Sequence, residues 1–248
     1  MNTKSVFFLI SINFLSFPIL SQKAWNPDES MKIKSISQTE ISNDGKKVAY
    51  VVREPIMEDK KSEYLSQIWV TDTESKENIQ YTFNQKSSSS PKFSPDGKKI
   101  AFLSSRSGKN QIWIINTLGG EARILTKEKK GVRSIKWSPD GKMISFLKSD
   151  DDTEDEIKSK ENKTDVILVD KKFKYSHIYS YHLDEDTVTQ VTSGNYSVNS
   201  FDYSPNGKKI IFSHQEDTNI NTGFINTDIS VIDSDGKNLK ILVDRPGR

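Results

Sequence analysis

Histidines are the residues of this chain best suited to acid–base or metal chemistry, and their spacing does not bring them together. The 248 residues contain three, His177, His182 and His214, and no Cys. His177 and His182 lie five residues apart in one expected strand, so their side chains point to opposite faces and cannot share a metal ion. His214 ends another expected strand and is predicted to be a surface residue. The histidines therefore indicate no metal or catalytic centre.

Carboxylates crowd into one acidic segment, 149–165, and could offer oxygen ligands to calcium. The candidate ligands are Asp150, Asp151, Asp152, Glu154 and Asp155. Calcium loops converge their ligands by one sharp turn that usually contains Gly, and this segment has none. Acidic and then mixed charge without apolar periodicity is typical of a solvated loop or of disorder. We therefore expect a loop here and no metal site.

Short catalytic motifs are also missing from the printed sequence. It contains no G-x-S-x-G nucleophile elbow, no H-E-x-x-H zinc motif, no phosphate-binding P-loop and no G-x-G-x-x-G. Asp44, Asp96 and Asp140 each precede a Gly, and that turn position explains them. The sequence thus predicts no catalytic residue, no bound cofactor and no metal ligand in this chain.

One sequence motif occurs four times, and its copies mark the expected β-strands. The copies are ISNDGKKVAYVV from Ile41, FSPDGKKIAFLS from Phe93, WSPDGKMISFLK from Trp137 and YSPNGKKIIFSH from Tyr203. The Asp-Gly or Asn-Gly pair in each copy supplies the positive φ that a tight hairpin turn needs. Each copy is therefore predicted to be a bend between two antiparallel strands.

Two further motifs follow each bend in fixed order. The second is SQIWVTDT, NQIWIINT, SHIYSYHL and TDISVIDS, and the third is NIQYTF, EARILT, TVTQVTS and NLKILVD. With the short strand before the Gly turn, each unit holds four alternating strands, which is typical of a propeller blade. The predicted fold is an all-β β-propeller with four blades, at about 31–83, 87–126, 131–192 and 197–243. A β-sandwich of unrelated hairpins would not explain the fixed order.

Repetition also bears on the large aromatic residues. Trp69, Trp113 and Tyr179 occupy the same place in three units, which is how packing positions behave. The alternative, in which these residues and Trp137 line a carbohydrate site of a lectin-like propeller, is less favoured.

Unit one carries a further charged insertion, EPIMEDKKSEYL at 54–65, between its second and third strands. Segment 149–165 is inserted at the same place in unit three, and insertions within repeats collect on one face, which is often the face that meets a ligand or partner.

The first 21 residues have the sequence pattern of an export signal. A basic start at Lys4 is followed by the apolar run VFFLISINFLSFPIL and then Ser21, as in a signal peptide cleaved near Gln22. An uncleaved membrane anchor is the alternative. The chain is therefore expected to be exported, to the periplasm or outside the cell, with no membrane span after cleavage. A net charge of +2 predicts no nucleic-acid partner.

Two stretches carry a family resemblance. AWNPDESMKIKSISQTEISNDGKKVAYVVR from Ala24 and FSPDGKKIAFLSSRSGKNQIWIINTLGGEARILT from Phe93 resemble secreted bacterial serine peptidases of the prolyl oligopeptidase family. The branch is the acylaminoacyl-peptidase and dipeptidyl-peptidase-like one, and the motifs are also similar to TolB-like propellers. The resemblance implies a seven- or eight-bladed propeller that admits peptides to a C-terminal α/β-hydrolase domain with a Ser-Asp-His triad.

This chain departs from that pattern, because it stops at Arg248 after the fourth unit. We expect an incomplete arc, 22–248, that is not an enzyme by itself and whose parent would act on peptide substrates. The alternative is a TolB-like periplasmic protein-binding scaffold with no enzymatic parent. An arc leaves both end blades with an uncovered apolar face, so the chain is expected to be marginally stable and to self-associate.

Overall fold

The computed structural model describes residues 26–58, 61–162, 174–216 and 227–244. The chain divides into a short unit, Met1–Ile33, and a long unit, Lys34–Arg248. The described part of the short unit contains one turn of helix, α1 (Pro27–Ser30). The expected signal peptide, 1–21, lies outside the described residues.

Four antiparallel sheets of four strands each make up the long unit, and in each the strands follow one another in chain order. Blade 1 comprises β1 (Ser35–Ile41), β2 (Lys47–Glu58), β3 (Lys61–Asp72) and β4 (Asn78–Gln80). Blade 2 comprises β5 (Ser88–Phe93), β6 (Lys99–Ser104), β7 (Gln111–Asn116) and β8 (Arg123–Ile124). Blade 3 comprises β9 (Arg133–Trp137), β10 (Met143–Ser149), β11 (Ser176–His182) and β12 (Thr187–Gln190). Blade 4 comprises β13 (Ser197–Tyr203), β14 (Lys209–Gln215), β15 (Asp228–Asp233) and β16 (Lys240–Val243).

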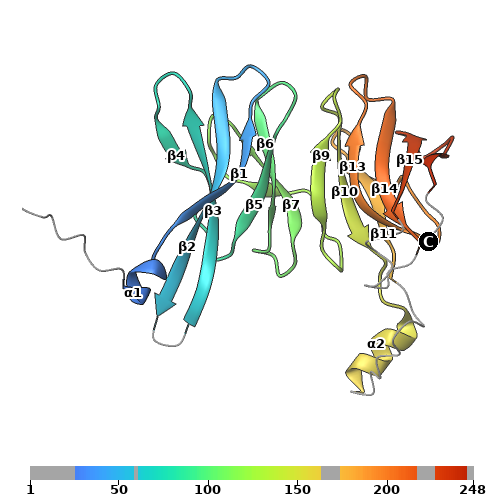
Figure 1. The fold of residues 1–248 in the computed structure, drawn as a ribbon, viewed down its shortest axis with the longest axis horizontal. Coiled ribbons are helices and arrows are strands. Elements are labelled where there is room, and N and C mark those ends of the chain that lie inside the picture. The colour runs from blue at the N-terminus through green and yellow to red at the C-terminus, as the bar shows by residue number, and fades with distance from the viewer. Residues whose placement is uncertain (1–25, 59–60, 163–173, 217–226, 245–248) are drawn as a thin grey trace, which may run out of the picture. The chain divides into compact units, whose positions relative to one another are not determined.

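Successive blades pack face to face around a buried Phe. Phe102 lies in the apolar cluster between blades 1 and 2, Phe146 in the cluster between blades 2 and 3, and Phe212 in the cluster between blades 3 and 4. All three side chains are almost fully buried. The described sheets thus form an open arc in chain order (Figure 1), which confirms the predicted fold of an incomplete β-propeller.

The Gly turns have one geometry in all four blades. In blade 1, Gly45 has φ +73° and its N–H donates to the Ser42 carbonyl at 2.8 Å. The Ser42 hydroxyl donates to Asp44 Oδ1 at 2.6 Å, and the same oxygen accepts from Lys46 N at 3.1 Å. These hydrogen bonds, Ser42 first, lower the pKa of Asp44. The Asp before the Gly in blades 1 to 3, and Asn206 before Gly207 in blade 4, are therefore turn residues.

A Thr that follows the outermost strand closes each of the first three blades. In blade 2, Thr126 Oγ1 accepts from Ile112 N at 2.9 Å and donates to Gln111 Oε1 at 2.7 Å. Thr82 makes the same two contacts in blade 1, with Ile68 and Gln67. Thr192 accepts from Ile178 N at 2.9 Å and lies 3.4 Å from His177 Nδ1 in blade 3. The Thr ending the third sequence motif thus joins it to the second motif.

Replacing Thr126 with Val should lower the free energy of unfolding by about 1–3 kcal/mol, because the buried Ile112 N–H loses its acceptor. Urea denaturation measures the loss. Thr187→Val is the matched control, since Thr187 is exposed and its hydroxyl donates to Glu185 at 3.2 Å; it should change stability by less than about 0.5 kcal/mol. Equal effects of the two substitutions would show that Thr126 does not close the blade.

The described residues of segment 54–65, which are 54–58 and 61–65, lie within strands β2 and β3 and not between them, so that prediction was wrong. β2 and β3 continue as a regular hairpin whose pairs run from Lys47↔Asp72 to Glu58↔Lys61. β1 pairs with β2 only as far as Arg53, so Pro55 lies where β2 has become an edge strand and needs no N–H on that side. The Arg53 guanidinium stacks 3.8 Å from the centre of the Tyr64 ring and braces the extension.

Part of segment 149–165 is helical, which corrects the prediction of a loop or disorder. Helix α2 (Glu154–Glu161) begins with a capping box: Thr153 accepts from Glu156 N, and the Glu156 carboxylate accepts from Thr153 N at 2.8 Å. None of its residues is buried, so local capping and ion pairs, rather than an apolar face, hold the helix. Residues 163–165 lie outside the described part.

Candidate functional site: the wall formed by the first strands

The first strands of the blades, β1, β5, β9 and β13, share an irregularity that shapes a wall. The pairing register with the second strand shifts near the middle of each first strand. In three blades one residue takes the left-handed conformation there: Gln38, Ser90 and Ser134 all have φ +53°. That region is uncommon for residues other than Gly. The bulge is therefore a repeated structural device.

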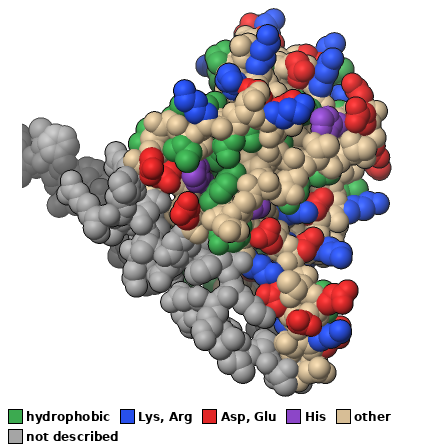
Figure 2. Space-filling model, turned by 90° about the vertical axis from the view of Figure 1, so that its right-hand side faces the viewer, with side chains coloured by type: hydrophobic (Ala, Val, Ile, Leu, Met, Phe, Trp, Pro, Cys, Tyr) green, Lys and Arg blue, Asp and Glu red, His purple; other side chains and the backbone are tan. Residues whose placement is uncertain are grey.

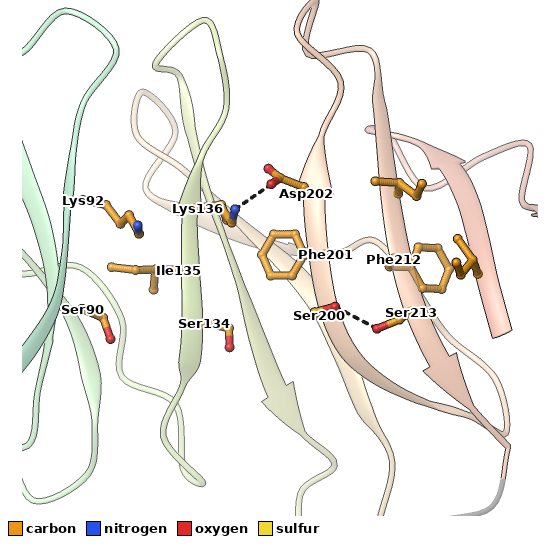
Figure 3. Close-up of a pocket in the computed structure, with 12 residues that line it drawn as sticks. Ser90, Lys92, Ser134, Ile135, Lys136, Ser200, Phe201, Asp202, Phe212 and Ser213 are labelled. Carbon is orange, nitrogen blue, oxygen red and sulfur yellow. Dashed lines mark hydrogen bonds and ion pairs between the residues drawn. The ribbon is translucent and has the colours of Figure 1, made fainter. Parts of the chain in front are cut away.

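A cavity of about 570 Å³ lies against this wall (Figure 3). Serines from equivalent positions in three blades, Ser90, Ser134 and Ser200, line it. Two positions further along each strand lie Lys92, Lys136 and Asp202, which also line it. The remaining lining residues are Ile135, Phe201, Ile211, Phe212, Ser213 and Ile229. The cavity thus combines hydroxyl groups and charges with an apolar end at blade 4.

Charges on the wall are paired between neighbouring blades. Lys92 Nζ of blade 2 lies 2.5 Å from Glu40 Oε2 of blade 1, and Lys136 Nζ of blade 3 lies 2.8 Å from Asp202 Oδ2 of blade 4. The order across the four blades is therefore acid, base, base, acid, with the two lysines in the middle. Figure 3 shows the Lys136–Asp202 pair beside the Ser200–Ser213 hydrogen bond.

Hydrogen bonds between side chains and backbone groups of neighbouring first strands hold the wall in place. The Gln38 side chain accepts from Ser90 N at 2.7 Å, and Trp137 Nε1 donates to the Lys92 carbonyl at 3.0 Å. The described lining residues offer hydroxyls, ammonium groups and a carboxylate. They include no His that could act as the base for a Ser. This arrangement is suited to hydrogen bonding and ion pairing with a bound chain.

Two of the histidines lie as predicted, on opposite faces of β11. His177 is buried, 3% exposed, while His182 is half-buried and contacts Thr189 Oγ1 through Nε2 at 2.9 Å. Burial lowers the pKa of His177. The imidazole is therefore held neutral inside the blade.

The prediction of a surface position for His214 was wrong. The side chain is 6% exposed, contacts Ser230 Oγ through Nε2 at 2.8 Å, and lies 4.7 Å, centre to centre, from the Tyr196 ring. Ser230 occupies the position that carries Trp or Tyr in the other blades, opposite Phe212 in the register. A small residue at that position leaves room for the imidazole. Burial lowers the pKa of His214.

Two of the three repeated aromatic residues, Trp113 and Tyr179, are packing residues. Trp69, Trp113 and Tyr179 lie opposite Tyr50, Phe102 and Phe146 in the strand registers. Trp113, Tyr179 and Trp137 pack against the buried clusters, and Trp69 lies half-buried on the outer face of blade 1.

Carboxylates of the acidic segment form ion pairs with lysines. Asp152 pairs with Lys130 at 2.6 Å and Lys160 at 2.9 Å, and these bonds lower the pKa of Asp152 to about 2. Asp150 accepts from Tyr175 N at 3.0 Å. Within the described residues, no three His, Asp or Glu side chains are grouped so that they could hold a metal ion. Neither described helix, α1 or α2, is long and apolar enough to cross a membrane.

Comparisons with known proteins agree on the propeller. The family profile PD40, TolB beta propeller domain, matches residues 40–176, more than half of the chain. The uncharacterized peptidase YuxL of Bacillus subtilis (strain 168) is 33% identical over 87 residues, which are 35% of this chain and 13% of that protein.

Solved structures of the same fold include an acylaminoacyl peptidase of Pyrococcus horikoshii, at TM-score 0.66 and 21% identity over 89% of this chain and 34% of that one. TolB of Acinetobacter baumannii matches at TM-score 0.58 and 22% identity, over 85% of this chain and 44% of that one. This chain spans less than half the length of each of these proteins. The predicted likeness to peptidase and TolB propellers is confirmed, and the chain belongs to the family of TolB beta-propeller domains.

Proposed function

We propose that this chain is the gating propeller of an exported serine peptidase and supplies no catalytic group itself. The carrying observation is the wall of the first strands, where hydroxyls and paired charges repeat from blade to blade beside a cavity of about 570 Å³. Relatedness to a peptidase in sequence and to an acylaminoacyl peptidase in fold supports the assignment. The Ser-Asp-His triad would lie in an α/β-hydrolase domain outside this chain, and peptides would be the substrates.

An extended peptide is the ligand that such a wall fits best. Its backbone N–H and C=O groups are unpaired and can exchange water for the Ser90, Ser134 and Ser200 hydroxyls. A folded protein has most of those groups already bonded within itself. The wall would therefore favour extended chains over folded domains, which is the selectivity that a gate requires.

Binding of an unstructured peptide to the chain tests this role. We expect fluorescence anisotropy of a labelled, unstructured peptide library to detect binding, and a folded domain of similar mass not to compete. Replacing Lys92 and Lys136 together with Gln should weaken binding about threefold to tenfold, because two partly exposed charges contribute modestly. No binding of any peptide would contradict the gate.

The control for that substitution uses lysines that carry the same charge elsewhere. Lys98 and Lys208 are exposed residues of the Gly turns, so the double variant Lys98→Gln with Lys208→Gln makes the same change in net charge. We expect it to bind peptide as the unchanged chain does. Equal weakening by both double variants would mean that net charge, and not the wall, attracts the peptide.

Two further measurements address catalysis and export. A serine-directed fluorophosphonate probe should leave the chain unlabelled, and labelling would reveal a nucleophile and overturn the non-catalytic role. Sequencing the N-terminus of chain secreted by a bacterial host should begin near Gln22, and an intact Met1 in the cell envelope would favour an anchor.

The second candidate function is a TolB-like periplasmic scaffold that binds another protein. The family match over residues 40–176 favours it. A pull-down from envelope extract separates the two functions: recovery of an envelope lipoprotein or outer-membrane complex supports the scaffold, and its absence together with peptide binding supports the gate.

A further inference from the structure

A cation lies over the aromatic ring of the third strand in both inner blades. In blade 3, Lys148 Nζ lies 4.4 Å from the centre of the Tyr179 ring. In blade 2, the Arg106 guanidinium lies 4.5 Å from the centre of the Trp113 ring. Tyr179 and Trp113 stand at equivalent positions, and each packs against the apolar cluster shared with the preceding blade. The two cations therefore occupy the same place in successive blades.

In blade 3 this cation has a counterion from the segment that follows blade 2. Lys148 Nζ lies 2.9 Å from Glu128 Oε2, and both side chains are mostly buried. Burial acts to lower the pKa of Lys148, but the hydrogen bond to Glu128 outweighs it and leaves that pKa raised. The blade 3 cation is thus neutralised within the chain.

In blade 2 a neutral amide stands where that counterion would be. Asn84, in the segment that follows blade 1, is the equivalent of Glu128. The Asn84 carbonyl accepts from Gln67 Nε2, and the Glu128 carbonyl accepts from the equivalent Gln111. The backbone at the two positions is therefore held alike, and only the side chain differs.

Arg106 is half-buried and makes its polar contacts with neutral groups. Its guanidinium donates to Ser104 Oγ at 3.1 Å and to Ser88 Oγ at 3.2 Å, and burial lowers its pKa. Within the described part of the chain, no carboxylate forms an ion pair with Arg106. On the side of blade 4 shown in Figure 2, by contrast, Lys and Arg side chains lie close to Asp and Glu side chains. A guanidinium has five N–H donors, so Arg106 retains donors that suit a carboxylate.

This guanidinium lines a cavity of about 440 Å³ between blade 2 and segment 81–85. Asn84 and the exposed Glu121 line it too. A second cavity of about 440 Å³ shares four lining residues with it, Tyr81, Phe83, Ile115 and Gly120. The two cavities thus form one groove, along which Phe83 is 76% exposed and Leu118 is 98% exposed. The groove combines an unpaired cation with an apolar stretch.

We propose that this groove binds an acidic peptide segment, with an Asp or Glu carboxylate on Arg106 and apolar side chains along Phe83 and Leu118. The bound carboxylate stands to Arg106 as Glu128 stands to Lys148, and the planar guanidinium can hold it through two parallel hydrogen bonds. The groove shares no lining residue with the cavity of the first strands. The proposal is therefore independent of the gating function.

Fluorescence anisotropy of a dye-labelled Phe-Asp-Leu peptide with an amidated C-terminus tests the proposal, and we expect it to bind the whole chain. The matched peptide Phe-Asn-Leu should bind about tenfold to a hundredfold more weakly, because it lacks the charge that strengthens these hydrogen bonds. Arg106→Gln should weaken binding of the Asp peptide by a similar factor. Circular dichroism should show that the variant remains folded.

Arg53→Gln is the matched control for that substitution. Arg53 also stacks on an aromatic ring, 3.8 Å from the centre of Tyr64, but it is exposed and lines neither cavity. The change in net charge is the same, so we expect this variant to bind the Asp peptide as the unchanged chain does.

Substitutions of Asn84 give the sharper result. Asn84→Glu places a carboxylate where Glu128 stands in the next blade, so Arg106 gains an internal counterion and binding of the Asp peptide should weaken about tenfold or more. Asn84→Gln adds the same length without the charge and should keep binding. The double variant Lys92→Gln with Lys136→Gln should also keep it, because those lysines line the other cavity.

The outcomes separate this site from the wall of the first strands. Binding that is kept in Arg106→Gln but lost in the Lys92 and Lys136 double variant would overturn this proposal and leave the gate standing. Equal binding of the Asp and Asn peptides, equal losses in Arg106→Gln and Arg53→Gln, or no difference between Asn84→Glu and Asn84→Gln would also overturn it. So would a chain that binds Phe-Ala-Leu with a free C-terminal carboxylate but not the amidated Asp peptide.

Discussion

Replacing Phe146 with Ala is expected to lower the free energy of unfolding by about 3–5 kcal/mol. Phe146 is 0% exposed in the cluster between blades 2 and 3, and its ring stacks on that of Tyr179 with centres 6.0 Å apart. Removing the ring leaves a cavity between two blades, which rigid sheets cannot collapse to fill. A loss of this size is a large share of the stability of an ordinary domain.

Urea denaturation followed by tryptophan fluorescence, at one fixed protein concentration, measures this loss. Phe83→Ala is the matched control, because Phe83 is 76% exposed, and it should change stability by less than about 0.5 kcal/mol. A Phe146→Ala chain as stable as the Phe83→Ala chain would mean that blade contacts do not hold the arc together.

Mild acid is expected to destabilise blades 3 and 4. His177 and His214 lie on either side of Tyr196, with ring centres 5.5 and 4.7 Å from its ring, and burial holds both pKa values below the ordinary 6.5. The unfolded chain therefore binds protons more readily than the folded chain. Stability should be constant above about pH 6.5 and fall as pH drops below that value through the lowered pKa values.

The urea midpoint measured from pH 8 to pH 5 checks this dependence. Gln67 and Gln111 stand at the His177 position in blades 1 and 2, and Ser104 stands at the His214 position, so His177→Gln with His214→Ser uses residues the fold already accepts there. This double variant should lose most of the decrease in stability at acidic pH. His182→Gln, at a half-buried position outside the cluster, should keep it. A fall of equal size in both variants would place its cause elsewhere.

Local signals made the strands and turns predictable. The Ser-x-Asp-Gly-Lys copies specify a turn because Ser42, Asp44, Gly45 and Lys46, all close along the chain, make most of its hydrogen bonds with one another. The capping box of α2 is equally local, and Thr153 with Glu156 could have revealed the helix within the acidic segment. The long hairpin of β2 and β3 was harder to recognise, because Pro55 and its charged neighbours are common in loops and are accepted here on an edge.

The sequence by itself determined the blades, because each blade is built from contacts close along the chain: alternation, a Gly turn and a closing Thr. Only the tertiary structure decided which residues meet between blades. Glu40 with Lys92 and Lys136 with Asp202 are 52 and 66 residues apart, and the burial of His214 depends on the small Ser230 of the neighbouring strand. Such contacts follow from the angle at which sheets stack, and no short-range pattern encodes that angle.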